Sequence, residues 1–427
     1  MKVKKVLSLF TGCGGMDIGF EGGFDVLTAS LNEKLHPDWS ERTIKKIFTR
    51  LKPTNFEILF CNDNWPAARN AWLNDFFSKK KVEPEVFNLD SIVDLVKRAR
   101  NGNREILPNK VDVVTGGFPC QDFSVAGKRL GFKSHRSHRG DLLQITDKPS
   151  EENRGKLYVW MRDVIDLVRP KVFIAENVKG LVSLTNVKTI IENDFRKIGK
   201  DGYLVLPARV LRATDYGVPQ TRSRVIFYGF LRSELRSEAV EALEKQRIPL
   251  AYDPYPIPTH GPAMTLSLRL DNLKPYVTVR QALSGLPEPE EAKNDLSQAS
   301  YSGAKWMGKH CQGQTEVNLD TSGPTIRSEH HGNIEFRRLS KEHGGNHKEE
   351  LNAGLKERRL TLRECARIQT FPDNYAFVIN SQRKISGIKL SVTDGYKLVG
   401  NAVPPLLAYH IARRLQEMWP KLFKKGV

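Results

Sequence analysis

The first 230 residues consist of short apolar runs that alternate with segments of helical spacing, and this rhythm restricts the fold most. Apolar residues three and four apart predict helices over 67–77 and 157–168. Short apolar strands that alternate with helices are typical of a parallel sheet covered by helices on both faces. The sequence therefore predicts an α/β fold with a doubly wound sheet. Its expected strands are 6–10, 57–61, 111–115 and 172–175.

This rhythm is lost between about residue 231 and residue 356. Proline, serine, glycine, asparagine and histidine become frequent there, which favours a loop-rich second domain or a large insertion. Helical patterning returns near the end of the chain, with a final helix expected over 406–418. Residues 25–55 form an extra excursion before the second strand. Within it, 43–51 is expected to be a basic amphipathic helix on the surface.

The charge balance points to a polyanionic partner. The chain carries 67 Lys and Arg against 49 Asp and Glu, a formal net charge of +18, which favours nucleic acid. Hydrophobic residues make up 39% of the chain, so a folded core is expected. No run of 18 apolar residues occurs, so neither a membrane span nor a signal peptide is expected. The five cysteines form no CxxC pair, which is typical of a reducing cytosol.

A glycine-rich segment follows the first expected strand and precedes an expected helix. Gly12 and Gly14 would let a ligand approach the backbone, and the helix N-terminus offers unpaired N–H groups. A dinucleotide fingerprint requires glycine at the position of Asp17, so pyrophosphate binding is disfavoured and a nucleoside ligand remains open. A structural tight turn is an equally good interpretation of this segment.

Asp63 directly follows the second apolar strand, where a carboxylate is well placed to bind ribose hydroxyls. Glu33 competes on spacing, because it lies 21 residues after Gly12 and the dinucleotide pattern has about 20. The strand before Asp63 and the helix after it favour Asp63. Trp65 is a candidate for stacking on adenine, with ordinary core packing as the alternative.

Cys120 lies just beyond the third apolar strand, in a loop between Pro119 and Gln121. Such a cysteine is exposed for nucleophilic attack. The segment 128–139 contains several cations and no acidic residue, and nearby cations favour the thiolate form of the cysteine. A buried structural cysteine is the alternative, and its polar neighbours argue against that. Glu176 ends the fourth strand at the same expected edge, where a partly buried carboxyl group can keep its proton and donate to a ring nitrogen.

Arg222 and Arg224 are two residues apart on an expected strand and therefore point the same way. They are candidates for binding a phosphate or a base carbonyl, with a surface salt bridge as the alternative.

Taken together and in this order, these motifs resemble those of the DNA (cytosine-5-)-methyltransferase family, of the bacterial restriction-modification type. Two later signatures add to the resemblance, one at 359–372 and one at 400–405. The resemblance covers residues 6–230 and 355–415. The joint match is very specific, although each glycine motif alone is not.

The resemblance implies an S-adenosylmethionine-dependent methyltransferase fold, which is Rossmann-like, with a smaller loop-rich target-recognition domain. The expected divisions are a catalytic and cofactor-binding domain at 1–230, a target-recognition domain at 231–355 and a C-terminal return at 356–427. This return would complete the catalytic domain.

The resemblance also implies a mechanism. A cytosine must leave the helix stack, because its carbon 6 cannot be reached inside a duplex. Cys120 would attack carbon 6, and Glu176 would interact with ring N3. Arg224, with Arg222 as a second candidate, would hold the base carbonyl or a phosphate. S-adenosyl-L-methionine would supply the methyl group to carbon 5. Its implied contacts are Phe10, Gly12, Gly14, Gly15, Asp63, Trp65, Asp90, Pro119, Asn401 and Val403. The implied DNA contacts are Gln121, Ser124, Arg129 and Arg327.

The implied partner is double-stranded DNA, methylated by a monomeric bacterial enzyme of the cytoplasm that associates with the nucleoid through DNA. No membrane is implied, and a cognate restriction endonuclease would act on the same site. No metal is expected, because the spacing of Cys311, His330, His331, His343 and His347 matches no structural zinc pattern. Phosphate contacts are expected mainly outside the middle region. Residues 251–350 carry 11 basic and 13 acidic residues, whereas 351–427 carry 14 and 5.

Three other functions compete with this interpretation. An RNA methyltransferase is the nearest rival, because one branch of the family acts on tRNA, but the long middle region favours DNA. A catalytically inactive DNA-binding regulator would have lost Cys120 or Glu176, and both are present. Asp17 and the absence of a hydride-transfer constellation exclude a nicotinamide-dependent oxidoreductase.

Overall fold

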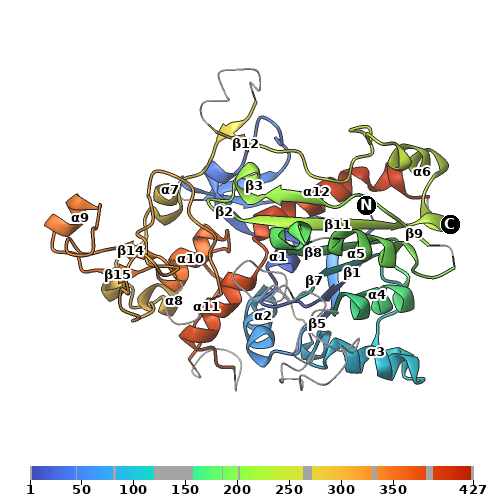
Figure 1. The fold of residues 1–427 in the computed structure, drawn as a ribbon, viewed down its shortest axis with the longest axis horizontal. Helices are drawn as coiled ribbons and strands as arrows, with labels where there is room; N and C mark the ends of the chain where they lie inside the picture. The colour runs from blue at the N-terminus through green and yellow to red at the C-terminus, as the bar shows by residue number, and fades with distance from the viewer. Residues whose placement is uncertain are drawn as a thin grey trace.

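A sheet of eight strands lies at the centre of the molecule (Figure 1). The computed structural model describes residues 2–44, 46–79, 83–119, 157–184, 186–200, 202–262, 272–328, 334–380 and 388–424. The strands of the sheet are β1 (Lys4–Leu9), β5 (Phe56–Asn62), β6 (Phe87–Asn88), β7 (Val113–Gly117), β8 (Val172–Val178), β9 (Tyr203–Val205), β10 (Arg209–Arg212) and β11 (Ser223–Leu231). Their order is β10–β11–β8–β7–β1–β5–β6, with β9 also beside β11. The four strands expected from the sequence are confirmed.

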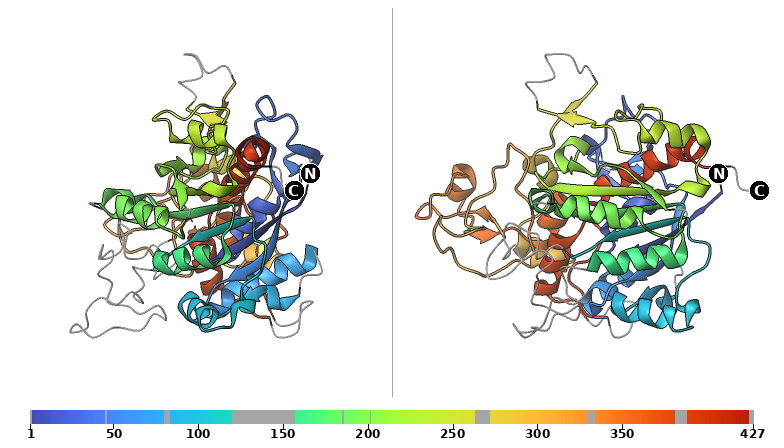
Figure 2. Two further views of the ribbon diagram at one scale, coloured as in Figure 1. Left: turned by 90° about the vertical axis from the view of Figure 1, so that its right-hand side faces the viewer. Right: turned by 45° about the vertical axis from the view of Figure 1, so that its right-hand side comes forward.

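Helices cover both faces of the sheet, as the left-hand view of Figure 2 shows. One face packs against α1 (Gly15–Glu21), α2 (Pro66–Lys79) and α12 (Pro405–Leu422). The other packs against α3 (Ile92–Arg100), α4 (Leu157–Val168) and α5 (Val187–Arg196). Alternate strand residues supply the two cores: Ile174 belongs to the first and Phe173 to the second. The predicted doubly wound α/β fold is therefore confirmed. None of the described helices is both long and apolar enough to cross a membrane.

The strand directions bring the predicted motifs to one edge of the sheet. Strands β1, β5, β6, β7 and β8 pair in parallel, so their carboxyl ends share that edge. Strand β11 runs antiparallel to β8 and β10, which places its first residues there too. Ligands of open α/β sheets bind outside the carboxyl ends of the strands. This edge is therefore where a site is expected.

The prediction of a helix at 43–51 is wrong. This segment belongs to a small antiparallel sheet of β2 (Asp25–Leu27), β3 (Ser40–Ile44) and β4 (Phe48–Leu51). Along β4, Thr49 and Leu51 are buried whereas Phe48 and Arg50 are partly exposed, which is the period of a strand. Burial of alternate side chains against the main body outweighs the weak helical pattern of charges.

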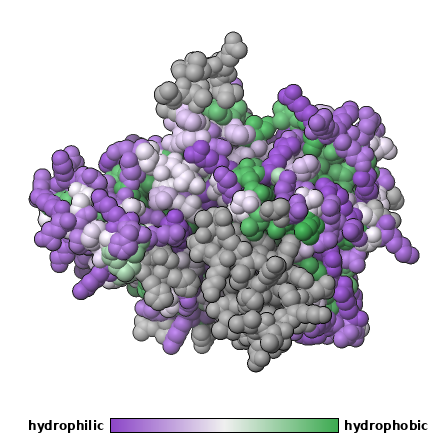
Figure 3. Space-filling model, in the orientation of Figure 1, coloured by the Kyte–Doolittle hydropathy of each residue, from purple (hydrophilic) through white to green (hydrophobic). Residues whose placement is uncertain are grey.

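A smaller, loop-rich lobe lies beside the carboxyl edge of the sheet (Figure 1). The small lobe is defined here by α8 (Leu296–Ala299), β14 (Phe336–Arg338), α9 (Lys348–Asn352) and β15 (Arg358–Arg359). A buried arginine, Arg359, fixes its loops: Nε donates to the Ala304 carbonyl at 2.7 Å and Nη1 donates to the Gly313 carbonyl at 2.8 Å. Figure 3 shows mainly hydrophilic residues on this face of the lobe.

Further short elements lie outside the small lobe as defined here. They are α6 (Ser237–Glu244), β12 (His260–Gly261), β13 (Lys274–Pro275), α7 (Val279–Leu283), α10 (Leu362–Ile368) and α11 (Val392–Asn401). Helix α6 lies against the end of α12, where the Arg236 N–H donates to the Leu422 carbonyl at 2.9 Å. Residues just after 231 therefore pack with the sheet and not with the small lobe.

Candidate active site

The loop after β1 has an unusual backbone. Phe10, Gly12 and Gly14 all adopt left-handed conformations, with φ of +51°, +55° and +77°. Glycine tolerates this conformation, whereas other residues adopt it at a cost. A Cβ atom on Gly14 would lie only 2.6 Å from Cδ1 of Trp72. The loop therefore turns tightly over α2 at the carboxyl end of β1, where the sequence predicts cofactor contacts.

Asp63 connects this loop to the end of β5. One carboxylate oxygen accepts from the Gly12 N–H at 2.9 Å, and the other accepts from the Trp65 N–H at 3.0 Å. Burial raises the pKa of Asp63, while these two N–H groups oppose the rise. The structure thus brings together Gly12, Asp63 and Trp65. Trp65 is partly buried and packs against the core.

Asp90 lies at the neighbouring strand end. Its backbone carbonyl accepts from the Asn62 side chain at 2.8 Å, which fixes it beside the end of β5. Its carboxylate pairs with Arg98 at 2.5 Å, and both side chains are well exposed. The predicted cofactor contacts Asp63 and Asp90 are therefore brought to neighbouring strand ends, with the Asp90 carboxylate facing a cation.

Sequence reasoning missed the structural role of Asp17. This buried carboxylate accepts hydrogen bonds from the Ser8 hydroxyl at 2.7 Å and the Trp72 indole at 2.8 Å. Burial raises its pKa to about 6. Asp17 therefore connects β1, α1 and α2 beneath the loop after β1, residues 10–14, which we call the glycine loop. The sequence feature that could have indicated this role is an acidic residue inside an otherwise apolar helix turn.

The C-terminal return closes this side of the site. A Cβ atom on Gly15 would lie 2.3 Å from the Val403 carbonyl, so the start of α1 touches the segment after α11. Val403 is buried, and the neighbouring Asn401 is exposed. The structure therefore brings together Gly15 and Val403, which lie almost 400 residues apart in the sequence.

Glu176 lies at the end of β8, opposite Gly117 of β7 in the parallel register. A Cβ atom on Gly117 would lie 2.9 Å from Oε2 of Glu176, so glycine makes room for this carboxyl group. Next to it, the Asn177 side chain donates to the Phe118 carbonyl at 3.0 Å. Burial raises the pKa of Glu176, and the neighbouring Arg224 and Arg222 oppose the rise.

The two predicted arginines have different surroundings. Nε of Arg224 pairs with Oε1 of Glu176 at 2.6 Å, so this guanidinium faces the candidate catalytic carboxyl group. Arg222 is almost fully buried. Its Nη1 donates to the Ile326 carbonyl and its Nη2 to the Gly400 carbonyl, each at 3.0 Å. This differs from the prediction that Arg222 meets a base or phosphate, because burial directs its donors to the backbone.

The remaining predicted residues divide into two groups. Pro119 is the last described residue before a gap, two residues beyond Gly117. The predictions for Cys120, Gln121, Ser124 and Arg129 fall outside the described residues. Arg327 is about one-third exposed and pairs with Glu335 at 3.1 Å. Its backbone packs against Gly400, where a Cβ atom would lie 2.2 Å from the Arg327 carbonyl carbon.

The two halves of the site thus offer different chemistry. The glycine loop, Asp63 and the 401–403 segment form a backbone-lined region near the ends of β1 and β5. Glu176 on β8 and Arg224 on β11, two and three strands from β1, form a buried acid and cation pair next to the chain that leads to Cys120. A carboxyl group of raised pKa beside a fixed guanidinium can donate a proton while the guanidinium holds an oxygen.

Comparison with known proteins identifies relatives over nearly the whole chain. The sequence profile of a family described as C-5 cytosine-specific DNA methylase matches residues 4–417. The chain is 29% identical over 422 residues to the Type II methyltransferase M.BspRI of Lysinibacillus sphaericus, which covers 96% of this chain and 81% of that protein. It is also 29% identical over 420 residues to the Type II methyltransferase M.BsuRI of Bacillus subtilis, with coverages of 95% and 78%.

A solved structure shares the fold. The S. pombe Dnmt2 methyltransferase superposes with a TM-score of 0.52 at 16% identity, over 96% of this chain and 98% of that chain. At this level of identity the likeness shows the fold alone.

Proposed function

This chain belongs to the C-5 cytosine-specific DNA methylase family and is a DNA (cytosine-5-)-methyltransferase, and from this premise we propose that it methylates carbon 5 of one cytosine within a specific double-stranded DNA sequence. The observation that carries the proposal is the buried Glu176, which faces Gly117 and pairs with Arg224. In the sequence, Cys120 follows Gly117 by three residues. The proposed nucleophile therefore follows β7 in the sequence, and the proposed proton donor lies on the neighbouring strand β8.

The proposed reaction begins when the target cytosine turns out of the helix, because its carbon 6 is otherwise shielded by stacking. The Cys120 thiolate would add to carbon 6, and the electron pair of the carbon 5–carbon 6 double bond would form the new bond to the methyl group, while the sulfur–methyl bond of S-adenosyl-L-methionine breaks and S-adenosyl-L-homocysteine leaves. Loss of the carbon 5 proton then re-forms the double bond and expels the thiolate. Splitting the reaction into addition and elimination makes a weakly nucleophilic carbon reactive.

Glu176 and Arg224 support the addition step. A protonated Glu176 donates to ring N3, so the negative charge that develops on the ring is neutralised as it forms. Burial favours the protonated form, because it raises the pKa of this carboxyl group. Arg224 is held at 2.6 Å from Glu176 and would bind the base carbonyl next to N3. Arg222 is assigned as a positioning residue that fixes the start of β11.

The glycine loop is proposed to bind S-adenosyl-L-methionine, because Gly12 has open space at its Cβ position and donates its N–H to Asp63, a carboxylate placed to bind ribose. When bound there, this co-substrate supplies an electrophilic methyl group. Phe10, Gly12, Gly14 and Gly15 are proposed to line its methionine and ribose. Asp63 would bind the ribose, and Trp65 and Asp90 the adenine. Pro119, Asn401 and Val403 would close the site.

The biological role proposed is protective methylation in a restriction-modification system, where a cognate endonuclease recognises the same sequence. The relatives named Type II methyltransferases support this role. The proposed partner is duplex DNA, with the small lobe reading the sequence and Arg327 contacting DNA. A monomer suffices for this role, because one chain carries the proposed nucleophile, proton donor and cofactor loop.

Methyl transfer assays on duplex DNA and on tRNA test the proposal. The wild-type chain should form 5-methylcytosine in DNA only, and bisulfite sequencing should place it in one sequence context. Cys120→Ser should form none while it retains S-adenosylmethionine binding. Preferred methylation of tRNA, or full activity of Cys120→Ser, would contradict the proposal.

A further inference from the structure

Three residues lie next to one another across the carboxyl edge of the sheet. Arg212, the last residue of β10, is opposite Ser223 of β11 in the antiparallel register. Arg224 is opposite Val178, so Ser223 adjoins Lys179, the residue that follows β8. Neighbouring strands are about 4.8 Å apart, so a serine stands between two cations in a row that spans two strand spacings. We call Lys179, Ser223 and Arg212 the edge row.

The cations of the edge row are available to a ligand. Lys179 and Arg212 are exposed, and Ser223 is partly exposed. Among the described residues, no acidic group forms an ion pair with Lys179 or Arg212, although many other arginines of the chain are paired. The Arg212 guanidinium lies 5.4 Å from the centre of the Tyr276 ring, and the Tyr276 hydroxyl donates to Asp215 at 2.8 Å. The aromatic ring therefore orients Arg212 without neutralising its charge.

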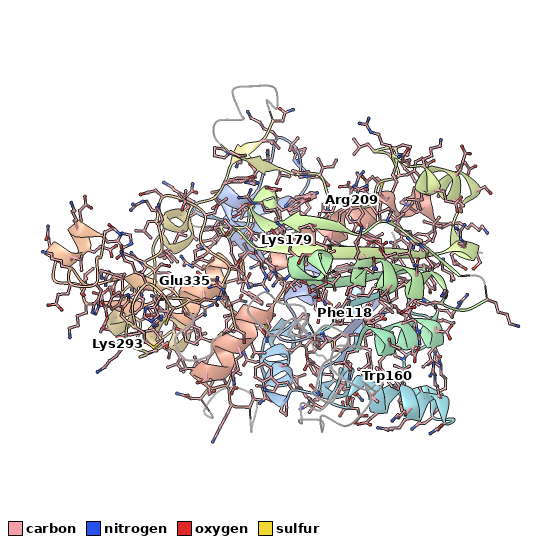
Figure 4. All side chains as sticks on the ribbon, in the orientation of Figure 1. Phe118, Trp160, Lys179, Arg209, Lys293 and Glu335 are labelled. Atoms are coloured by element: carbon pink, nitrogen blue, oxygen red, sulfur yellow. The ribbon has the colours of Figure 1, made fainter. Side chains whose placement is uncertain are left out.

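Arg209 provides a direct contrast on the same strand. It is exposed like Arg212, but its guanidinium pairs with Asp253 at 2.6 Å and lies 4.3 Å from the Tyr255 ring. It lies at the other end of β10, away from the carboxyl edge. In Figure 4, Lys179 lies nearer to the small lobe than Arg209 does. The cation of β10 that has no acidic partner among the described residues is therefore the one that adjoins the site.

We propose that the edge row binds a backbone phosphate of the DNA, next to the nucleotide that turns out toward Glu176. The Arg224 guanidinium donates to the Ser223 carbonyl at 2.9 Å, and Lys179 lies three residues after Glu176, so the row borders the acid and cation pair. Two cations and a hydroxyl donor are the groups that proteins use to hold a phosphodiester. Such a contact fixes the strand on one side of the extruded base without reading its sequence. This inference rests on the proposed function.

The salt dependence of DNA binding tests the edge row. We expect Lys179→Gln and Arg212→Gln each to weaken binding of duplex DNA, with KM for DNA raised and kcat nearly unchanged. The slope of log K against log salt concentration should become shallower by about 0.9 for each phosphate that the variant no longer neutralises. Arg212→Lys should restore most of the slope, because it restores the charge. Arg209→Gln is the matched control and should leave the slope at its wild-type value.

Bisulfite sequencing separates phosphate binding from base reading. The edge row predicts that the double variant Lys179→Gln, Arg212→Gln methylates the same sequence context as the wild type. A changed context, or an unchanged salt slope in the double variant, would overturn the inference while the wild type still methylates DNA. Failure of the wild type to methylate DNA at all would instead overturn the proposed function.

Discussion

Glu176 combines the two properties that the proposed chemistry requires of a single residue. It is 7% exposed, which favours the protonated carboxyl group, and it contacts a guanidinium that favours the carboxylate. The direction of the pKa shift is upward, because burial is the larger of the two effects. The free carboxyl group therefore keeps its proton to a higher pH than a glutamate in water does.

Glu176→Gln tests this residue. An amide can donate to ring N3 but cannot transfer a proton, so we expect kcat to fall by a factor on the order of 10² to 10⁴. Binding of S-adenosylmethionine, measured by calorimetry, should remain within about twofold of the wild type, because Glu176 lies apart from the glycine loop. Glu192→Gln is a control of equal burial, at 7% exposure, on helix α5. Equal loss of activity in the two variants would show that burial alone accounts for the effect.

At the scale of residues, the sequence predicts where a side chain lies on the sheet better than it predicts which groups that side chain contacts. Asp63, Glu176 and Arg224 were predicted from their places on the strands, and their carboxylates and guanidinium lie where strand ends meet. The surroundings of Arg222 were not predictable, because its carbonyl partners come from residues 326 and 400. The period of a strand shows which way a side chain points and not which distant backbone it meets.

At the scale of elements, contact between α1 and α12 joins the two ends of the catalytic fold. Gly19 of α1 faces α12 so closely that a Cβ atom would lie 2.4 Å from both the Pro405 carbonyl and Cβ of Ala408. Helix pairs approach this closely only through small residues. The C-terminal return therefore docks through a surface that has no room for a methyl group.

Gly19→Ala should separate these helices. We expect a loss of about 1–3 kcal/mol in the free energy of unfolding, because overpacking forces backbone shifts. Urea titration followed by circular dichroism measures it. Gly303→Ala is the matched control, since nothing lies within 4 Å of the Cβ position there. If both variants unfolded at the same urea concentration, the close docking of α1 on α12 would be contradicted.

The elements of the sheet were largely predictable, whereas the 25–55 excursion was not. Continuous apolar runs and helical spacing identify buried strands and their covering helices. The 43–51 segment is short and lies at the surface, so its charges fitted a helix although its alternate residues are buried in β4. The contacts that select the strand come from β2, to which the sequence offers no pointer.

At the scale of the whole molecule, buried histidines make stability depend on pH. Nε2 of His260 lies 3.1 Å from the Ala29 carbonyl, so this histidine connects the 25–55 excursion to β12. Burial lowers the pKa of His260 to about 4. The unfolded chain therefore takes up a proton near pH 6.5 that the folded chain refuses until about pH 4. Stability is lost as the pH falls through this window.

The variant His260→Gln should lose less stability on acidification. The difference from the wild type should grow between pH 6.5 and pH 4 and reach about 3 kcal/mol, which corresponds to the lowered pKa. Urea midpoints measured at several pH values provide this difference, and the exposed His310→Gln serves as the control. Parallel pH profiles for the wild type and His260→Gln would contradict it. The pKa of Asp17 is raised to about 6, so Asp17 changes stability with pH in the direction opposite to His260. Because both proteins contain Asp17, its contribution cancels when the variant is compared with the wild type.

The most direct test of the central claim is a covalent trap. In duplex DNA with 5-fluorocytosine at the methylated position, fluorine replaces the proton that must leave carbon 5, so elimination of the thiolate is blocked. With S-adenosylmethionine present, we predict a stable protein–DNA complex whose peptide map places the adduct on Cys120. The absence of any adduct, or an adduct on another residue, would contradict the account.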